Sequence, residues 1–180
     1  MPKQKLGFNV YDAAVDRIKF AFDNFDKIYL SFSAGKDSTV MLHMVLDEAI
    51  KRDRKIGLLL IDLEGQYKLT IEHALECFEL YKDHIEPYWV CLPIHLRNAV
   101  SVYEPFWKCW DSEAKKSWIR DMPKDCISDI NYFDFFHDGM EFEEFVPLFG
   151  KWYSKGDKCC CFFFIFFYES LNRFRTIASE

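Results

Sequence analysis

One glycine-containing turn between an apolar strand and a helix constrains this chain more than any other stretch of its sequence. The turn reads Ser33-Ala34-Gly35-Lys36-Asp37-Ser38. Residues 28–33 are typical of a buried strand, and residues 39–52 follow the period of an amphipathic helix. A strand–turn–helix unit aims the N–H groups of the first helical turn at one point, where the helix dipole adds partial positive charge. The sequence therefore predicts a phosphate-binding turn.

The turn is not a Walker A loop. That loop has a glycine five residues before its Gly-Lys pair and a Ser or Thr after the lysine. Leu30 and Asp37 occupy these two positions here. The alternative to a phosphate site is an ordinary strand–turn–helix whose polar residues only cap the helix.

Each side chain of the turn offers something that a phosphate site needs. The hydroxyls of Ser33 and Ser38 can donate to phosphate oxygens, and Gly35 lets the backbone approach a ligand closely. Lys36 can neutralise phosphate charge as a mobile cation. Asp37 can cap the helix or help to hold Mg²⁺. We expect Lys36 and Asp37 to be catalytic.

Strands and helices alternate through the first half of the chain. We predict helices at 11–24, 39–52 and 67–82, and strands at 27–33, 56–61 and 87–92. Near-continuous apolar strands alternating with helices are typical of a parallel sheet covered on both faces, with ligands at the carboxyl ends of the strands. The predicted fold is therefore a three-layer α/β/α domain with a mainly parallel sheet. In helix 39–52, the residues expected to face the core are Val40, Met44, Leu46, Ala49 and Ile50.

The pattern becomes irregular over residues 98–157, which hold four of the five tryptophans and a short predicted helix at 141–149. We interpret this segment as an aromatic-rich insertion, which either closes over a substrate as a lid or packs over the sheet. Residues 159–168 then predict a fourth, fully buried strand, and residues 169–178 predict a last helix.

Composition limits the class of protein and its partners. At 180 residues, with 50% hydrophobic and 29% charged residues, the chain is a single globular domain. The net charge of −6 and the lack of a basic run do not indicate a nucleic-acid partner. The longest apolar run has about ten residues, fewer than a membrane-spanning helix needs. We expect a cytoplasmic protein with reduced thiols, and with no membrane partner.

The cysteines do not predict a metal centre. Cys159, Cys160 and Cys161 are adjacent and lack the usual spacing of zinc ligands. A metal or iron–sulfur site would require Cys77, Cys91, Cys109 or Cys126 to converge. We therefore expect buried structural thiols and no iron–sulfur cluster.

Four segments together resemble the phosphoadenosine phosphosulfate (PAPS) reductase-like family, within the PP-loop ATP pyrophosphatases. These segments are residues 29–38, 60–66, 145–149 and 169–175. The resemblance implies that the turn holds the phosphates of ATP or of an adenylyl sulfate such as PAPS. It also implies a set of nucleotide-binding residues, with Asp37 and Asp62 as Mg²⁺ ligands. The set is Ser31, Ser33, Ala34, Gly35, Lys36, Asp37, Ser38, Asp62 and Arg173.

Two features depart from the pattern of that family. Relatives have a glycine and an arginine where this chain has Phe164 and Phe166, so one expected anion contact is missing. The nucleophilic cysteine in the C-terminal tail of true PAPS reductases is also missing. These departures are those expected of a truncated phage or bacterial member.

The sequence leaves three functions open. The first is adenylyl transfer to an acceptor, with release of pyrophosphate and assistance from Mg²⁺. The second is a catalytically reduced regulatory protein that binds a nucleotide, and the third is a thiol-dependent PAPS reductase. The expected partners are a small-molecule nucleotide, an acceptor that the sequence does not identify, and either another copy of the chain or a partner protein.

Overall fold

The computed structural model describes residues 7–98 and 102–163. Its elements in chain order are α1 (Val10–Asn24), β1 (Lys27–Ser31), α2 (Lys36–Lys51), β2 (Ile56–Ile61), α3 (Lys68–Leu80), β3 (Ile85–Val90), β4 (His95–Arg97), β5 (Phe106–Lys108), the 3₁₀ turn η1 (Lys115–Ser117), α4 (Phe142–Tyr153) and β6 (Cys159–Phe162).

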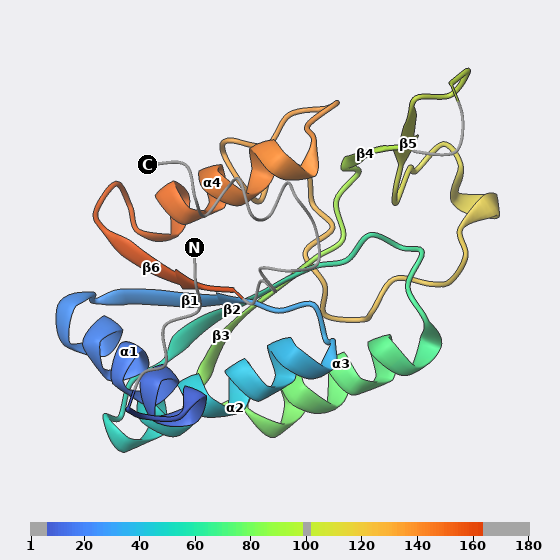
Figure 1. The fold of residues 1–180 in the computed structure, drawn as a ribbon. Helices are drawn as coiled ribbons and strands as arrows, with labels where there is room; N and C mark the ends of the chain where they lie inside the picture. The colour runs from blue at the N-terminus through green and yellow to red at the C-terminus, as the bar shows by residue number, and fades with distance from the viewer. Residues whose placement is uncertain (1–6, 99–101, 164–180) are drawn as a thin grey trace.

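Four parallel strands form the central sheet, in the order β3-β2-β1-β6. Helices α1, α2 and α3 cover one face and α4 covers the other (Figure 1). This arrangement confirms the predicted three-layer α/β/α fold. Strands β4 and β5 form a separate antiparallel pair beyond the sheet (Figure 1).

The central strand β2 explains why the sheet is parallel. All six of its residues, Ile56–Ile61, are buried, because helices cover the sheet on both sides. A strand in this position needs an uninterrupted apolar run rather than an alternating one. The sequence IGLLLI supplies it, and the predicted bounds of this strand agree with the structure.

Glycine lets α4 lie close to the sheet. A Cβ at Gly57 in β2 would lie 2.9 Å from Tyr29 Cβ and 3.0 Å from Tyr153 Cζ. The Tyr153 hydroxyl donates to the Ile28 carbonyl, 3.1 Å away. The Tyr29 ring meets the rings of Phe149 and Tyr153 edge-on, with centroids 5.2 and 5.6 Å apart. The aromatic-rich segment therefore builds the second covering layer of the sheet.

The strand order places the carboxyl end of β1 at the point where the sheet changes its direction of winding. Strand β1 lies between β2 and β6, so the connections from this point of the sheet run in opposite directions. Ligands of open α/β sheets bind in the crevice at such a switch point, outside the carboxyl ends of the strands. The turn of residues 33–38 directly follows β1 and is therefore at this point.

Several predicted details differ from the structure. Strand β1 ends at Ser31 and helix α2 begins at Lys36, two and three residues earlier than predicted. Helix α4 extends to Tyr153, four residues past the predicted end. Helix α2 turns Leu42, Val45, Leu46 and Ala49 into the core, whereas Val40 and Ile50 are exposed. These two lie off the stripe that the buried residues make at helical spacing.

The prediction of a fully buried last strand is wrong for its described part. All four residues of β6 are half-buried, and Phe163 is 57% exposed. The rest of that strand, the predicted helix 169–178, Phe164, Phe166 and Arg173 lie outside the described residues. No described helix has the length and apolar character needed to cross a membrane.

Candidate functional site

The turn after β1 combines a left-handed residue with an uncapped helix start. Ala34 has φ 56°, a conformation that reverses the chain between strand and helix. Gly35 is the N-cap residue of α2 and makes no side-chain capping bond. The first N–H groups of a helix have no acceptor within the helix. The first N–H groups of α2 therefore lie at the carboxyl edge of the sheet without acceptors inside the helix.

Two serine hydroxyls meet inside the turn. Ser33 Oγ lies 3.0 Å from Ser38 Oγ, which is also 3.0 Å from the Gly35 carbonyl oxygen. A hydroxyl has one hydrogen. If Ser38 donates it to Gly35, Ser33 donates to Ser38. Both serines predicted to bind phosphate are thus brought together, with Ser33 exposed and Ser38 buried.

The Gly35 carbonyl accepts from three donors. Besides Ser38 Oγ, the Thr39 N–H and the Thr39 hydroxyl donate to it, at 3.0 and 2.9 Å. Since the only hydrogen of Thr39 Oγ1 is used in this way, the ring N–H of His73 Nε2 donates to Thr39, at 2.9 Å. His73 belongs to α3, so a second helix contacts the first turn of α2.

Lys36 and Asp37 form a pair on the surface of the turn. Lys36 Nζ lies 2.8 and 2.7 Å from the two carboxylate oxygens of Asp37. The Lys36 side chain is 82% exposed, so this ion pair contributes little to stability. Ser31 lies at the end of β1 and is half-buried.

Gly35 is not required by the fold. Its φ of −79° suits any residue, and a Cβ there would meet only Ser33 Oγ, at 3.4 Å. The positive φ of the turn belongs to Ala34 instead. The effect of glycine at position 35 is to keep the start of α2 uncovered.

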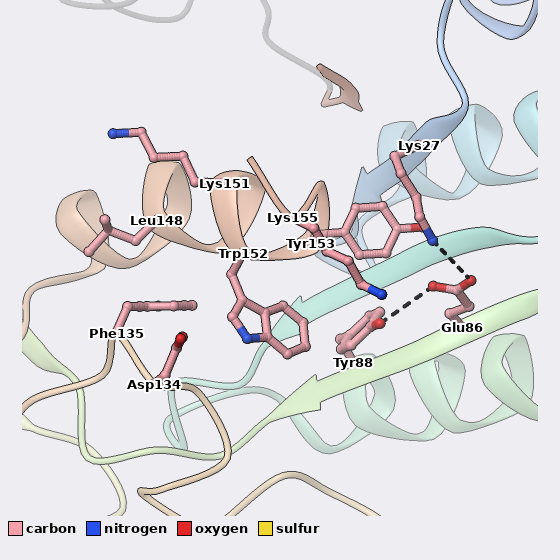
Figure 2. Close-up of a pocket in the computed structure, with 10 residues that line it drawn as sticks. All are labelled: Lys27, Glu86, Tyr88, Asp134, Phe135, Leu148, Lys151, Trp152, Tyr153 and Lys155. Carbon is pink, nitrogen blue, oxygen red and sulfur yellow. Dashed lines mark hydrogen bonds and ion pairs between the residues drawn. The ribbon is translucent and has the colours of Figure 1, made fainter. Parts of the chain in front are cut away.

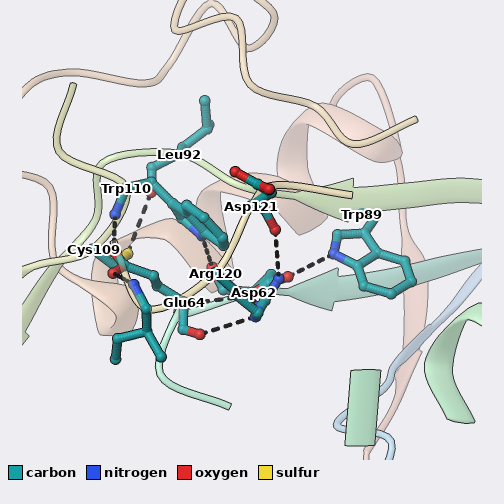
Figure 3. Close-up of polar contacts among 9 residues, drawn as sticks. Asp62, Glu64, Trp89, Leu92, Cys109, Trp110, Arg120 and Asp121 are labelled. Atoms are coloured by element: carbon teal, nitrogen blue, oxygen red, sulfur yellow. Dashed lines mark hydrogen bonds and ion pairs between the residues drawn. The ribbon is translucent and has the colours of Figure 1, made fainter. Parts of the chain in front are cut away.

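Asp62 follows β2 at the same edge of the sheet, and its carboxylate already accepts hydrogen bonds from protein donors (Figure 3). Its carboxylate is buried and accepts from Trp89 Nε1 at 2.9 Å, from the Glu64 N–H at 3.0 Å and from Arg120. The Trp110 indole also donates to the Asp62 carbonyl, at 2.6 Å. A Mg²⁺ ion at Asp62 would have to displace Arg120.

Glu64 is the second carboxylate of this network and is only 4% exposed. It accepts from the Trp110 and Ile119 N–H groups, at 2.8 and 3.1 Å. Arg120 Nε donates to the Glu64 carbonyl at 3.1 Å, and its guanidinium lies 4.9 Å from the Trp110 ring centroid. Glu64 is therefore a buried, hydrogen-bonded carboxylate rather than a solvated loop residue. Its oxygens fix the segment that carries Arg120.

Sequence reasoning missed Trp110 and Arg120. They lie 48 and 58 residues from Asp62, in the irregular segment, where no periodicity or motif singles them out. Of the predicted Mg²⁺ ligands, Asp37 pairs with Lys36 and Asp62 with Arg120. Within residues 7–98 and 102–163, no three His, Cys, Asp or Glu side chains are arranged to hold a metal ion.

Six of the seven thiols do not have the character of nucleophiles. Burial raises the pKa of Cys77, Cys91, Cys126 and Cys160, and raises that of Cys109 to about 12 and that of Cys161 to about 11. A reactive thiol needs a lowered pKa, because the thiolate is the nucleophile.

Fold and site define a three-layer α/β/α protein with a strand–turn–helix unit at the switch point of its sheet. No family model matches the chain. It is 40% identical over 178 residues to a protein of Escherichia coli (strain K12), the uncharacterized protein YbdN. The match covers 98% of this chain and 43% of YbdN, so the chain spans less than half the length of that relative.

Proposed function

We propose that the chain is a PP-loop domain of the PAPS reductase-like type, which binds ATP or an adenylyl sulfonucleotide at residues 33–38. One observation carries the proposal: a glycine that the fold does not need lies at an uncapped helix start, at the switch point of a parallel sheet. Helix starts of this kind favour phosphate. A cytoplasmic location, where thiols stay reduced, is part of the proposal.

The reaction that this arrangement supports best is adenylyl transfer. The β- and γ-phosphates would lie against the backbone donors of the turn, with Lys36 balancing their charge. A nucleophile on the acceptor would attack the α-phosphorus, forming a bond to AMP and breaking the bond to the pyrophosphate oxygen. Mg²⁺, held by the phosphates and Asp37, would supply charge neutralisation for the departing pyrophosphate.

A second function is favoured by the Asp62 network. Trp89 and Arg120 already occupy the carboxylate that the family pattern assigns to the nucleotide or its metal. A protein with this arrangement can bind a nucleotide as a regulatory ligand without turning it over. Release of pyrophosphate in the presence of Mg²⁺ separates the two functions, because only adenylyl transfer generates it.

Calorimetry with ATP and Mg²⁺, and separately with PAPS, tests the proposal. Gly35→Trp covers the start of α2 and should abolish binding. Gly7→Trp is the matched control, because a Cβ at Gly7 meets nothing within 4 Å. Thermal unfolding of both variants checks that the fold is kept. Equal binding by the wild type and Gly35→Trp would overturn the proposal.

A further inference from the structure

A cavity of about 590 Å³ lies between α4 and the edge of the sheet at β3 (Figure 2). Lys27 at the start of β1, Glu86 and Tyr88 near the start of β3, and the last turns of α4 surround it. Small-molecule sites have volumes of about 300 to 1,000 Å³, so the cavity is large enough for a ligand. Nothing in the proposed nucleotide chemistry uses it.

Its walls are aromatic and already fixed. Tyr88 meets Trp152 at 5.9 Å and an interplanar angle of 90°, and meets Tyr153 at 5.8 Å and 85°. Trp152 also packs on Phe133, at 4.9 Å. Interlocked rings lose little freedom when a ligand arrives, so a planar molecule can stack here at low entropic cost.

The cavity lining has more lysines than carboxylates, whereas the protein as a whole has a net negative charge. Its lining carries three lysines, Lys27, Lys151 and Lys155, against two carboxylates, Glu86 and Asp134, on a chain of net charge −6. In Figure 2 Lys151 points away from the ring walls, whereas Lys27 and Lys155 flank Glu86. The distance from Lys27 Nζ to Glu86 is 3.8 Å, a loose contact for an ion pair. This end of the cavity is cationic.

Lys155 stands where a helix end favours glycine. It follows the C-cap of α4 and has φ 54°. That position is usually glycine, because a side chain is strained in the left-handed region. Residues that break a local rule are expected where function requires them.

We propose that this cavity binds a small planar aromatic anion, with its ring on Trp152 and Tyr88 and its negative group at Lys155, because Lys27 is already paired with Glu86. Asp134 at the other end disfavours a second negative group. The ligand class is therefore an aromatic monocarboxylate or monosulfonate. This site is separate from the nucleotide site.

Fluorescence titration with 1-anilino-8-naphthalenesulfonate tests the proposal, because this probe is a monosulfonate on a planar naphthalene ring. N-phenyl-1-naphthylamine, which lacks the sulfonate, is the neutral comparison. Lys155→Gln should weaken binding of the sulfonate by about fivefold, the size of an exposed charge contact, and leave the neutral probe unchanged. Lys158→Gln is the matched control, since Lys158 is exposed and does not line the cavity.

Two further variants keep the test decisive. Lys155→Gly should lose the same affinity while unfolding at an equal or higher temperature, because it relieves the strained backbone. Gly35→Trp should bind the probe like the wild type, because no residue of the turn lines the cavity. The proposal fails if the folded wild type shows no saturable binding, if Lys155→Gln and Lys158→Gln bind equally, or if Gly35→Trp abolishes the signal.

Discussion

Replacing Arg120 by methionine tests the most consequential contact at the carboxyl edge of the sheet. The substitution keeps an unbranched chain over Trp110 but removes the charge that faces Asp62. The Asp62 side chain is 0% exposed and that of Arg120 is 18% exposed, so the remaining carboxylate is not rescued by water. Removing one partner of a buried pair costs about 3 to 5 kcal/mol.

The other contacts of Asp62 and Arg120 decide where within that range the loss of unfolding free energy falls. Trp89 Nε1 and the Glu64 N–H still donate to Asp62, at 2.9 and 3.0 Å, which favours the lower end. The bond from Arg120 Nε to the Glu64 carbonyl is also lost, which adds about 1 kcal/mol. We therefore expect the free energy of unfolding to fall by about 4 kcal/mol.

Urea unfolding followed by far-UV circular dichroism measures this loss. Arg97→Met is the matched control, because Arg97 pairs with Glu141 at 3.1 Å with its side chain 76% exposed. It should change the free energy of unfolding by about 1 kcal/mol at most. The double variant Arg120→Met/Asp62→Asn should recover part of the loss, because the unpaired charge is gone. An Arg120→Met protein within about 1 kcal/mol of the wild type would refute the reasoning.

Three other predictions concern separate parts of the molecule. Gly57→Ala should lower the free energy of unfolding by about 1 to 3 kcal/mol, whereas Gly35→Ala should change it little, because only the first places a Cβ under 3.0 Å from a neighbour; chemical denaturation compares them. Ser38→Ala should cost about 1 kcal/mol through its bond to Gly35 and should weaken nucleotide binding in calorimetry. The Asp138 carbonyl and Glu144 raise the pKa of His137, so its contribution to stability is present at pH 5 and lost as the pH rises past that pKa. The difference in Tm between the wild type and His137→Gln should therefore vanish by pH 8, and a constant difference would contradict this.

The sequence predicted those features that depend on neighbours in the chain. The apolar run of β2 and the turn after β1 each contain the information that forms them. The prediction of which α2 residues face the core was partly wrong, because an apolar residue such as Val40 can lie beside the buried stripe and remain exposed. The half-buried state of β6 was missed because its composition suits a central strand, whereas only β1 pairs with it among the described strands.

The candidate site also has a part that the sequence predicts and a part that it does not. Ser33, Gly35 and Ser38 belong to one turn, and their proximity follows from sequence spacing. The engagement of Asp62 by Arg120 does not, since it depends on how a long irregular segment returns to the sheet. Long-range polar pairs of this kind carry no local signature.

The peptide group between Gly35 and Lys36 has an electronic consequence. Three donors converge on its carbonyl oxygen. Each draws electron density toward that oxygen and away from the amide nitrogen of the same peptide plane, so hydrogen bonds in such chains strengthen one another. The N–H of that plane is the one that opens helix α2. The side chains of Ser38 and Thr39, and His73 through its bond to Thr39, therefore polarise this peptide group. They make its N–H a stronger hydrogen-bond donor at the position where a negative ligand would approach.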